Sequence, residues 1–372
     1  MHSSSPLGTR PSLNPFSLSL SLKVFILSTA LLPLHSINAS KADSHQFNHV
    51  VNKSKLVVVS VADPSLVFQD GKHFHGFGYD LAHNYADSLS VKLEFTTVAD
   101  NSTALKMVSQ GKANFAMTTA SFSQIEAKNL TSFSASCGAE QTLQKHGLNS
   151  NINWVFKYAD DPLSQTASGF VCRSQKNGAT QQLASFYSPN AVKSSSWKII
   201  QKDLRQRMPI YKASFQQTAK KYDLDWHLLA AIGYQESYLK PNSVSPTGVR
   251  GLMMLTNSTA KAMGVTNRTD PVQSIQGGAK YYNQMLKQFD HIAFPDRHWY
   301  ALVAYNMGPG AVNGIQKRLK SQGKNPNDWV NFYAYLDQNK AKNGRYRQAV
   351  QYVTRIRAYL EHIKTTPQLV NI

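Results

Sequence analysis

The chain has 372 residues, of which 42% are hydrophobic, so it is long enough to form two ordinary domains. Lysine and arginine outnumber aspartate and glutamate by 40 to 21, which gives a formal charge of +19. Its 12 histidines form no His-Glu-x-x-His pattern and no Cys/His ligand spacing, so we expect neither a metal site nor a cofactor.

The N-terminal segment has the pattern of an export signal. Residues 1–23 carry two basic side chains and no acidic one, and the apolar run Val24–Leu34 follows. This run is too short to span a bilayer, and Ala39 is a small residue before a cleavage point at Ser40. We therefore predict a signal peptide over residues 1–39 and a protein of the periplasm, with an uncleaved membrane anchor as the alternative.

The excess of basic residues narrows the class of partner. Removal of the predicted signal peptide would leave a charge of +17. Outside the cytoplasm a nucleic acid partner is not expected, and the charge suits an anionic wall polymer or an anionic membrane surface, such as that of the outer membrane. The alternative is that many of the lysines serve only solubility.

Strand and helix patterns alternate between residues 55 and 118. The β-branched apolar run Leu56–Val61 predicts a buried strand. The elements that follow are a helix ending near Leu89, a strand over Val91–Thr97, a helix over Thr103–Gln110 and a strand over Ala113–Thr118. This order predicts an α/β module with a parallel sheet. We expect His73 and His75, which flank Phe74, to be surface residues of a turn.

Two stretches of this region, Gly76-Phe77-Gly78-Tyr79-Asp80-Leu81-Ala82 and Gly111-Lys112-Ala113-Asn114-Phe115, resemble the first lobe of the family 3 periplasmic solute-binding proteins. Trp154-Val155-Phe156 looks like the return of the chain into that lobe. Only Cys137–Asn153 is available for the second lobe, so we expect a single lobe over residues 50–190. The family's ligand-binding arginine is absent near Gln124–Lys128, which argues against amino-acid binding and favours a regulatory or positioning role.

Cys137 and Cys172 are the only cysteines. An even pair in an oxidising compartment favours a disulfide, and two isolated buried thiols are the alternative. By the resemblance, Cys137 would lie near the missing lobe and Cys172 on the returning helix. A bond between them would then close the shortened loop.

The remainder of the chain has a helical pattern. Ser, Pro and Asn are frequent from residue 187 to 196, which indicates a linker, and residues 191–207 are interpreted as linker and basic helix. The helices expected after it are Pro209–Lys221, Asp225–Tyr238, Thr256–Met263, Pro271–Phe289, Asp296–Tyr305, Ala311–Gln322 and Arg345–Ile363. Residues 208–366 are therefore predicted to form a mainly α domain, and the whole chain an α+β protein of two domains.

Glu236 is the strongest catalytic candidate. It shares one face of the predicted helix with Leu229 and Ile232, so its side chain should point inward. A carboxyl group among apolar side chains resists ionisation, and a raised pKa suits a general acid. The alternative is a structural Glu that caps or pairs locally.

Three further segments accompany Glu236-Ser237: Ser245-Pro246-Thr247-Gly248-Val249-Arg250-Gly251-Leu252-Met253-Met254, Ala304-Tyr305-Asn306-Met307-Gly308-Pro309-Gly310, and Tyr352-Val353 with Ile356. Together they resemble the family 1 lytic transglycosylases with a soluble-transglycosylase domain, over nearly all of residues 208–364. The resemblance is nearest to the branch in which a solute-binding module precedes this domain. The wider family often has Gln where Met254 stands, so the contacts of that Gln are not carried over.

The resemblance implies a lysozyme-like fold in which Glu236 is the acid and base of a peptidoglycan-cleaving enzyme. Ser245 and Asn306 would contact the sugar, and Tyr352 would support the carboxylate. Ser237, Gly251, Met253, Met254 and Tyr305 are the other residues expected along the substrate groove. Each has an ordinary alternative, such as a turn for Ser245, a helix cap for Asn306 and core packing for Tyr352.

The distribution of acidic residues bears on mechanism. Ordinary glycosidases use two carboxyl groups, yet no Asp or Glu occurs between residues 237 and 269. A one-acid mechanism follows, in which the substrate's N-acetyl group assists and the muramyl 6-hydroxyl attacks in place of water. The family resemblance implies a 1,6-anhydromuramyl product from the MurNAc–GlcNAc β-1,4 bond. The alternatives are a hydrolytic muramidase and a non-catalytic sensor that binds muropeptides; protein partners are not predicted.

Overall fold

The structure of the chain is a computed structural model that describes residues 45–64, 66–71 and 73–370. The predicted signal peptide lies outside the described residues. All the described residues belong to one compact unit, with an α/β module in its N-terminal part and a helical domain in its C-terminal part. None of the described helices combines the length and the apolar character needed to cross a bilayer.

The module is built on a five-stranded sheet with the order β4-β1-β5-β7-β6. The strands are β1 (Lys55–Val61), β4 (Lys92–Val98), β5 (Phe115–Thr118), β6 (Thr131–Ser134) and β7 (Asn153–Phe156). β1 pairs in parallel with β4 and β5, whereas β7 is antiparallel to β5 and β6. The predicted parallel sheet is therefore mixed, because antiparallel neighbours need no long crossover helix.

The helices of the module are α1 (His45–Asn52), α2 (Phe77–Ser88), α3 (Asn101–Ser109), α4 (Phe122–Glu126), α5 (Glu140–Lys145), α6 (Pro162–Lys176) and α7 (Ala179–Tyr187). Local caps fix several of their starts. Asp100 accepts a hydrogen bond from the Thr103 N–H at α3, and Asp161 accepts one from the Leu163 N–H at α6. These starts could be expected because a cap is a local signal.

A short antiparallel pair, β2 (Phe68–Asp70) and β3 (His73–His75), corrects one prediction. His75 is only 2% exposed, and its Nε2 lies 3.1 Å from Glu361 Oε1. The prediction that it is a surface residue was wrong, because a residue far along the chain covers it.

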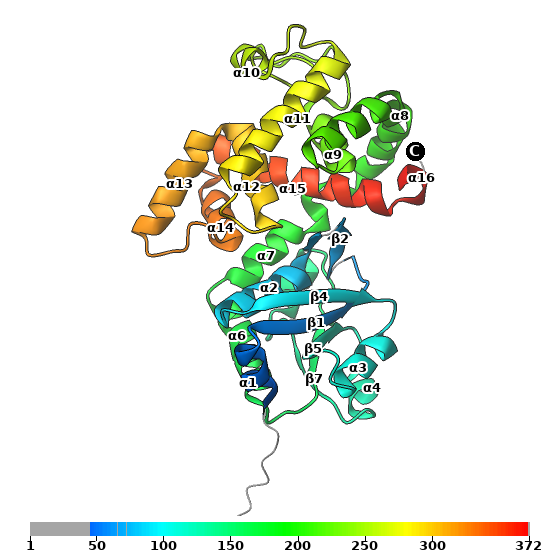
Figure 1. Cartoon of the computed structure of the whole chain (residues 1–372), viewed down its shortest axis with the longest axis vertical. Coiled ribbons are helices and arrows are strands. Elements are labelled where there is room, and N and C mark those ends of the chain that lie inside the picture. The colour runs from blue at the N-terminus through cyan, green and yellow to red at the C-terminus, as the bar shows by residue number, and fades with distance from the viewer. Residues whose placement is uncertain (1–44, 65, 72, 371–372) are drawn as a thin grey trace, which may run out of the picture. The chain divides into compact units, whose positions relative to one another are not determined.

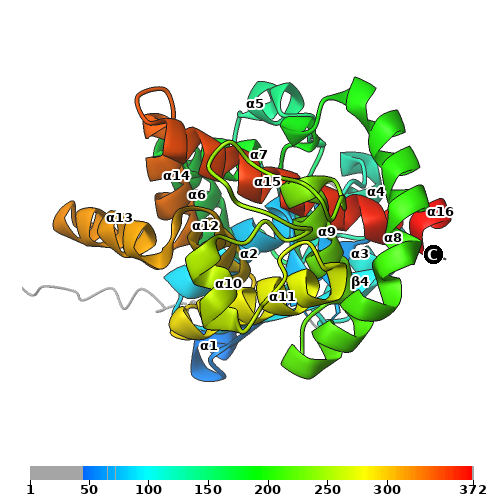
Figure 2. The same cartoon turned by 90° about the horizontal axis from the view of Figure 1, so that it is seen from above.

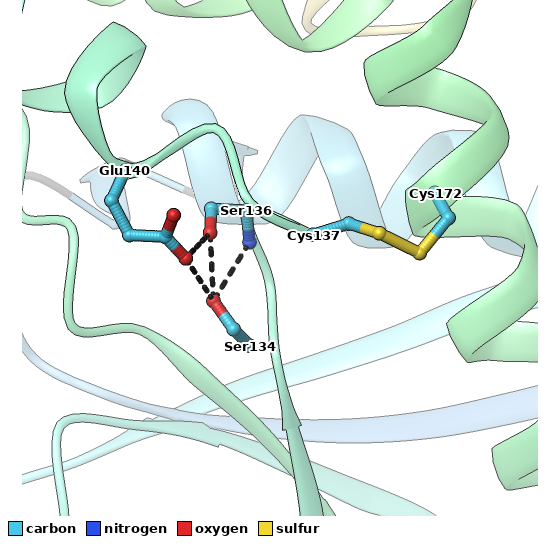
Figure 3. Close-up of a disulfide and its surroundings, with 5 residues drawn as sticks. All are labelled: Ser134, Ser136, Cys137, Glu140 and Cys172. Carbon is cyan, nitrogen blue, oxygen red and sulfur yellow. Dashed lines mark hydrogen bonds between the residues drawn. A yellow bond between two sulfur atoms is a disulfide. The ribbon is translucent and has the colours of Figure 1, made fainter.

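Cys137 and Cys172 are joined by a disulfide that connects the segment after β6 to α6 (Figure 3). No free cysteine remains in the chain. Beside the bond, Glu140 Oε1 accepts hydrogen bonds from the hydroxyls of Ser134 and Ser136. The disulfide and this hydrogen-bonded cluster together hold the segment between β6 and β7.

Replacement of both Cys137 and Cys172 by Ser is expected to lower the free energy of unfolding by about 2–4 kcal/mol. The bond closes a loop between residues 35 positions apart, so its loss increases the entropy of the unfolded chain. Urea denaturation of the variant, beside wild type with and without reductant, measures this. An unchanged midpoint in both the variant and the reduced protein would contradict the expectation.

The helical domain surrounds a central helix, α15. Its helices are α8 (Trp197–Tyr222), α9 (Trp226–Ser237), α10 (Asn257–Met263), α11 (Pro271–Gln288), α12 (Asp296–Met307), α13 (Pro309–Ser321), α14 (Trp329–Asn339), α15 (Gly344–Thr365) and α16 (Pro367–Val370). α15 packs against α9, α12 and α14, as both views show (Figures 1 and 2). This packing brings the last motif of the sequence beside the end of α9.

The predicted helix break at Met208 is absent, because α8 continues through Pro209. Pro209 is exposed, so its ring lies on the solvent side, and it removes only its own N–H from the helix. Buried Leu204 and Met208 before it and Phe215 after it hold both halves against the domain. Tertiary packing therefore outweighs the local cost of proline.

Helix α14 was not predicted, although its sequence carries a clear signal. Its buried residues Trp329, Phe332, Tyr333 and Leu336 have the spacing of one helical face. The aromatic rings of this face surround Phe186 of α7, with centroids 5.2 Å from both Trp329 and Tyr333. One cluster of buried apolar residues consequently runs through both the module and the helical domain.

Candidate active site

Helix α9 positions Glu236. Asp225 caps its start by accepting a hydrogen bond from the His227 N–H at 2.8 Å, as the sequence predicts. Its end is set by Tyr238, which adopts the left-handed conformation with φ of 55°. The residues of α9 on the same helical face as Glu236, Leu229 and Ile232, are buried. Glu236 therefore lies in the last turn of a buried helix, where the chain enters the loop toward Gly251.

Glu236 as a residue is partly exposed, but its carboxyl group is enclosed by protein. Burial raises its pKa to about 8, while a hydrogen bond from Tyr352 acts in the opposite direction. The Tyr352 hydroxyl donates to Glu236 Oε1 at 2.6 Å. With this pKa the carboxyl group holds its proton at neutral pH and can donate it to a leaving oxygen.

Ser237 lies beside Glu236 in the sequence but faces the protein interior. It is 2% exposed, and its hydroxyl donates to the Leu252 carbonyl at 2.8 Å. The same oxygen accepts a hydrogen bond from the Lys240 N–H at 3.2 Å. Ser237 therefore holds the turn of residues 251–254 against the end of α9, and its side chain faces away from the solvent.

Gly251 is required by the geometry of that turn. Its φ is +93°, and a Cβ atom built there would lie 1.9 Å from the Arg268 carbonyl oxygen. Arg268 in turn donates from Nη1 to the carbonyls of Gly248 and Leu255, at 3.0 and 2.9 Å. The backbone around Gly251 is thus tied down from two sides, and no side chain fits.

The two methionines of the turn differ. Met253 is fully buried against Gly278, its N–H donates to Ser274 Oγ at 3.0 Å, and its carbonyl accepts from the Tyr305 hydroxyl at 2.9 Å. Met254 is partly exposed and has a left-handed backbone, with φ of 46°. Met253 therefore holds the Tyr305 hydroxyl through its carbonyl, and Met254 is the methionine whose side chain is accessible to a ligand.

Tyrosine rings line the other side of Glu236. The rings of Tyr305 and Tyr352 are nearly parallel, with centroids 6.5 Å apart. The ring centroid of Tyr281 lies 5.2 Å from that of Tyr305. Tyr281 was not singled out from the sequence. Its position one turn of α11 after the buried Gly277 and Gly278 could have indicated that it faces the same site.

Asn306 and Ser245 are the two predicted sugar contacts that are partly exposed. In the described part of the chain the Asn306 amide makes no hydrogen bond, and Arg345 fixes the turn after it by donating to the Met307 carbonyl at 2.8 Å. The Ser245 hydroxyl accepts from the Val249 N–H at 3.0 Å, which is a turn contact. Asn306 is therefore free to bind a ligand, whereas Ser245 has a structural bond already.

No second carboxylate of the described chain influences the pKa of Glu236. Asp270 caps α11 by accepting from the Gln273 N–H at 2.8 Å, and Asp296 accepts from the Trp329 N–H at 3.2 Å. Within the described residues no group of three or more His, Cys, Asp or Glu side chains is arranged to hold a metal ion. The site offers a single proton-carrying carboxyl group.

Replacement of Tyr352 by Phe is expected to shift the alkaline limb of the pH–activity profile to higher pH. The hydrogen bond from Tyr352 stabilises the charged carboxylate, so its loss raises the pKa of Glu236 above about 8. We expect a rate loss of roughly tenfold. Tyr305→Phe is the matched control, because that hydroxyl donates to Met253 instead. If the alkaline limb of the pH–activity profile stayed at the same pH in Tyr352→Phe, the hydrogen bond from Tyr352 would not control the pKa of Glu236.

The domain model and the curated proteins that this chain resembles all carry the name of one kind of enzyme. The model of the transglycosylase SLT domain matches residues 213–327. Membrane-bound lytic murein transglycosylase F of Stutzerimonas stutzeri is 42% identical over 238 residues, which cover 60% of this chain and 49% of that protein. The enzyme of the same name from Marinobacter nauticus is 39% identical over 225 residues, covering 57% and 45%. The chain thus spans about half the length of the curated relatives it matches.

Among solved structures, the 70 kDa soluble lytic transglycosylase of Escherichia coli aligns with a TM-score of 0.34 and 17% sequence identity. The alignment covers 55% of this chain and 36% of that one.

Proposed function

We propose that this chain is a peptidoglycan lytic transglycosylase, because residues 213–327 match the transglycosylase SLT domain and the similar proteins are named lytic murein transglycosylases. The observation that carries the proposal is the single buried carboxyl group of Glu236, which has a pKa of about 8 and a 2.6 Å bond from Tyr352. A protonated carboxyl group without a carboxylate partner suits cleavage that relies on the substrate for its nucleophile.

In the proposed reaction, Glu236 protonates the glycosidic oxygen between MurNAc and GlcNAc. The N-acetyl group of the substrate stabilises the positive charge that develops at the anomeric carbon. The Glu236 carboxylate then removes the proton of the muramyl 6-hydroxyl, whose oxygen attacks the anomeric carbon. The bond that breaks and the bond that forms are both within the glycan, so no water is consumed and Glu236 regains its proton.

The other site residues take positioning or binding roles in this proposal. Asn306 and Met254 are partly exposed and would contact the sugars, while Tyr352 orients the carboxyl group. Ser237, Gly251 and Met253 shape the turn and act through the backbone. Ser245 would contact the glycan only with an oxygen that also serves its turn.

The proposed setting is the bacterial envelope, which fits the relatives named membrane-bound and the strongly basic composition. We place the protein in the periplasm, with the glycan strands of peptidoglycan as substrate and an anionic membrane surface as a peripheral contact. The module of residues 50–190 and the catalytic domain of residues 208–366 would then work together in remodelling of the cell wall.

Digestion of purified peptidoglycan, followed by mass spectrometry of the products, tests the reaction. We expect muramyl ends that lack one water relative to reducing ends, because the 6-hydroxyl is the nucleophile. Reducing muramic acid ends would assign a hydrolytic muramidase, and binding of muropeptides without turnover would assign a sensor. Incubation in isotopically labelled water adds a control, since only hydrolysis incorporates the label.

A further inference from the structure

A basic hollow of about 640 Å³ lies on the module, away from the residues of the catalytic site. Four separate segments line it: α1 with the residue after it, the start of β1, the loop before β5 and the residues after β7. Helix α1 packs beside β1 and α6, so these segments are held by the sheet (Figure 1). The hollow is thus built by the fold and not by one run of basic sequence.

The lining carries positive charge without balancing carboxylates. It includes Lys53, Lys55, Lys112 and Lys157, and neither Asp nor Glu lines it. Lys55 is paired with Glu94 at 3.1 Å. The other three ammonium groups have no ion-pair partner among the described residues. A group with two or more negative oxygens would be attracted to this hollow.

The hollow also offers neutral hydrogen-bond donors. Asn114 lines it, and Asn114 Oδ1 accepts from the Val57 N–H at 2.7 Å. The oxygen is therefore occupied by the backbone of β1, which leaves the amide N–H groups of Asn114 to donate. Asn52 and His49 of α1 add further polar atoms to the same wall. Several N–H donors around an ammonium cluster match the acceptor oxygens of a phosphate group.

An aromatic side chain is exposed beside the lysines. Tyr158, which lines the hollow, is 47% exposed, and Lys157 Nζ lies 5.2 Å from its ring centroid. Tyrosine and lysine side by side are typical of protein surfaces at the headgroup level of a membrane. A soluble phosphate alone would leave the aromatic ring of Tyr158 without a contact.

We propose that this hollow binds the phosphate of an anionic phospholipid headgroup, with Lys53, Lys112 and Lys157 around the phosphate and Tyr158 in the interface. The site would hold the module at a membrane surface. It rests on the proposed envelope location but not on the proposed chemistry of Glu236.

Vesicle sedimentation of the purified full chain tests the site, with phosphatidylcholine vesicles that contain or lack phosphatidylglycerol. The test variant combines Lys53→Glu, Lys112→Glu and Lys157→Glu. The matched control combines Lys106→Glu, Lys128→Glu and Lys176→Glu, which are exposed on the same module and do not line the hollow. We expect the test variant to lose on the order of 100-fold in affinity for the anionic vesicles, and the control variant to bind nearly as wild type.

Equal losses in both triple variants would show general charge attraction and overturn the site. No binding of wild type to anionic vesicles would also overturn it. Binding of glycerol phosphate or inorganic phosphate, followed by NMR, without vesicle binding would reassign the hollow to a soluble phosphate compound and contradict the lipid. Peptidoglycan digestion is measured on the same samples, and unchanged activity in all variants separates this result from any failure of the catalytic proposal.

Discussion

Glutamine in place of Glu236 is expected to lower the rate of peptidoglycan cleavage by roughly 100- to 10,000-fold. The amide has nearly the shape of the carboxyl group, and Tyr352 can still donate to its oxygen, but it carries no proton for the leaving group. Product release from purified peptidoglycan, measured with time, gives the effect. Activity near wild type in Glu236→Gln would remove Glu236 from the proposed role.

The thermal midpoint of Glu236→Gln, compared with that of wild type, shows whether the variant is folded. The sign of the difference between the two midpoints follows from the pKa of Glu236. The pKa of Glu236 is raised to about 8 by burial, so wild type loses stability as the pH rises from the ordinary pKa of a Glu through about 8. Glutamine has no such cost. We expect the thermal midpoint of Glu236→Gln to match wild type near pH 4 and to exceed it at pH 8. A midpoint far below wild type at every pH would mean that the activity loss reflects misfolding.

Among the described glycines of the helical domain, Gly251 is the one at which substitution by alanine is expected to have the largest effect. The new Cβ would lie 1.9 Å from the Arg268 carbonyl oxygen, and alanine disfavours the φ of +93°. We expect a loss of about 3 kcal/mol or more in the free energy of unfolding, together with loss of cleavage. Denaturant unfolding and the peptidoglycan assay measure the two effects.

Gly248→Ala is the matched control for this prediction. Gly248 lies in the same turn and has a φ of +79°, but no atom lies within 4 Å of the Cβ position. Only the conformational cost of about 1 kcal/mol should appear. If both variants behaved alike, the close approach at Arg268 would not be the cause, and the turn would have more freedom than the structure shows.

The orientation of Glu236 could be predicted because it depends on local signals. Asp225 is a cap, and the apolar spacing of Leu229 and Ile232 fixes a helical face. The hydrogen bond from Tyr352 could not be derived from spacing, since 116 residues separate the two side chains. It was expected only because the motifs resemble a known family.

The interior position of Ser237 could not be predicted for a different reason. It is the last residue of α9, and its hydroxyl meets a carbonyl that is brought back by the loop through Leu252. Helical periodicity gives the direction of a side chain, but not what a returning loop places against it. The same limit explains His75, whose cover, Glu361, comes from the far end of the chain.

The continuity of α8 determines how the chain can be divided for biochemical study. A fragment that begins at residue 208 would start in the middle of this 26-residue helix. It would lack Ile200 and Leu204, which are buried, and Trp197, whose ring stacks on His362 with centroids 4.3 Å apart. Apolar faces of the remaining helices would then be open to water and prone to aggregation. A fragment that begins ahead of Trp197 would keep this scaffold whole.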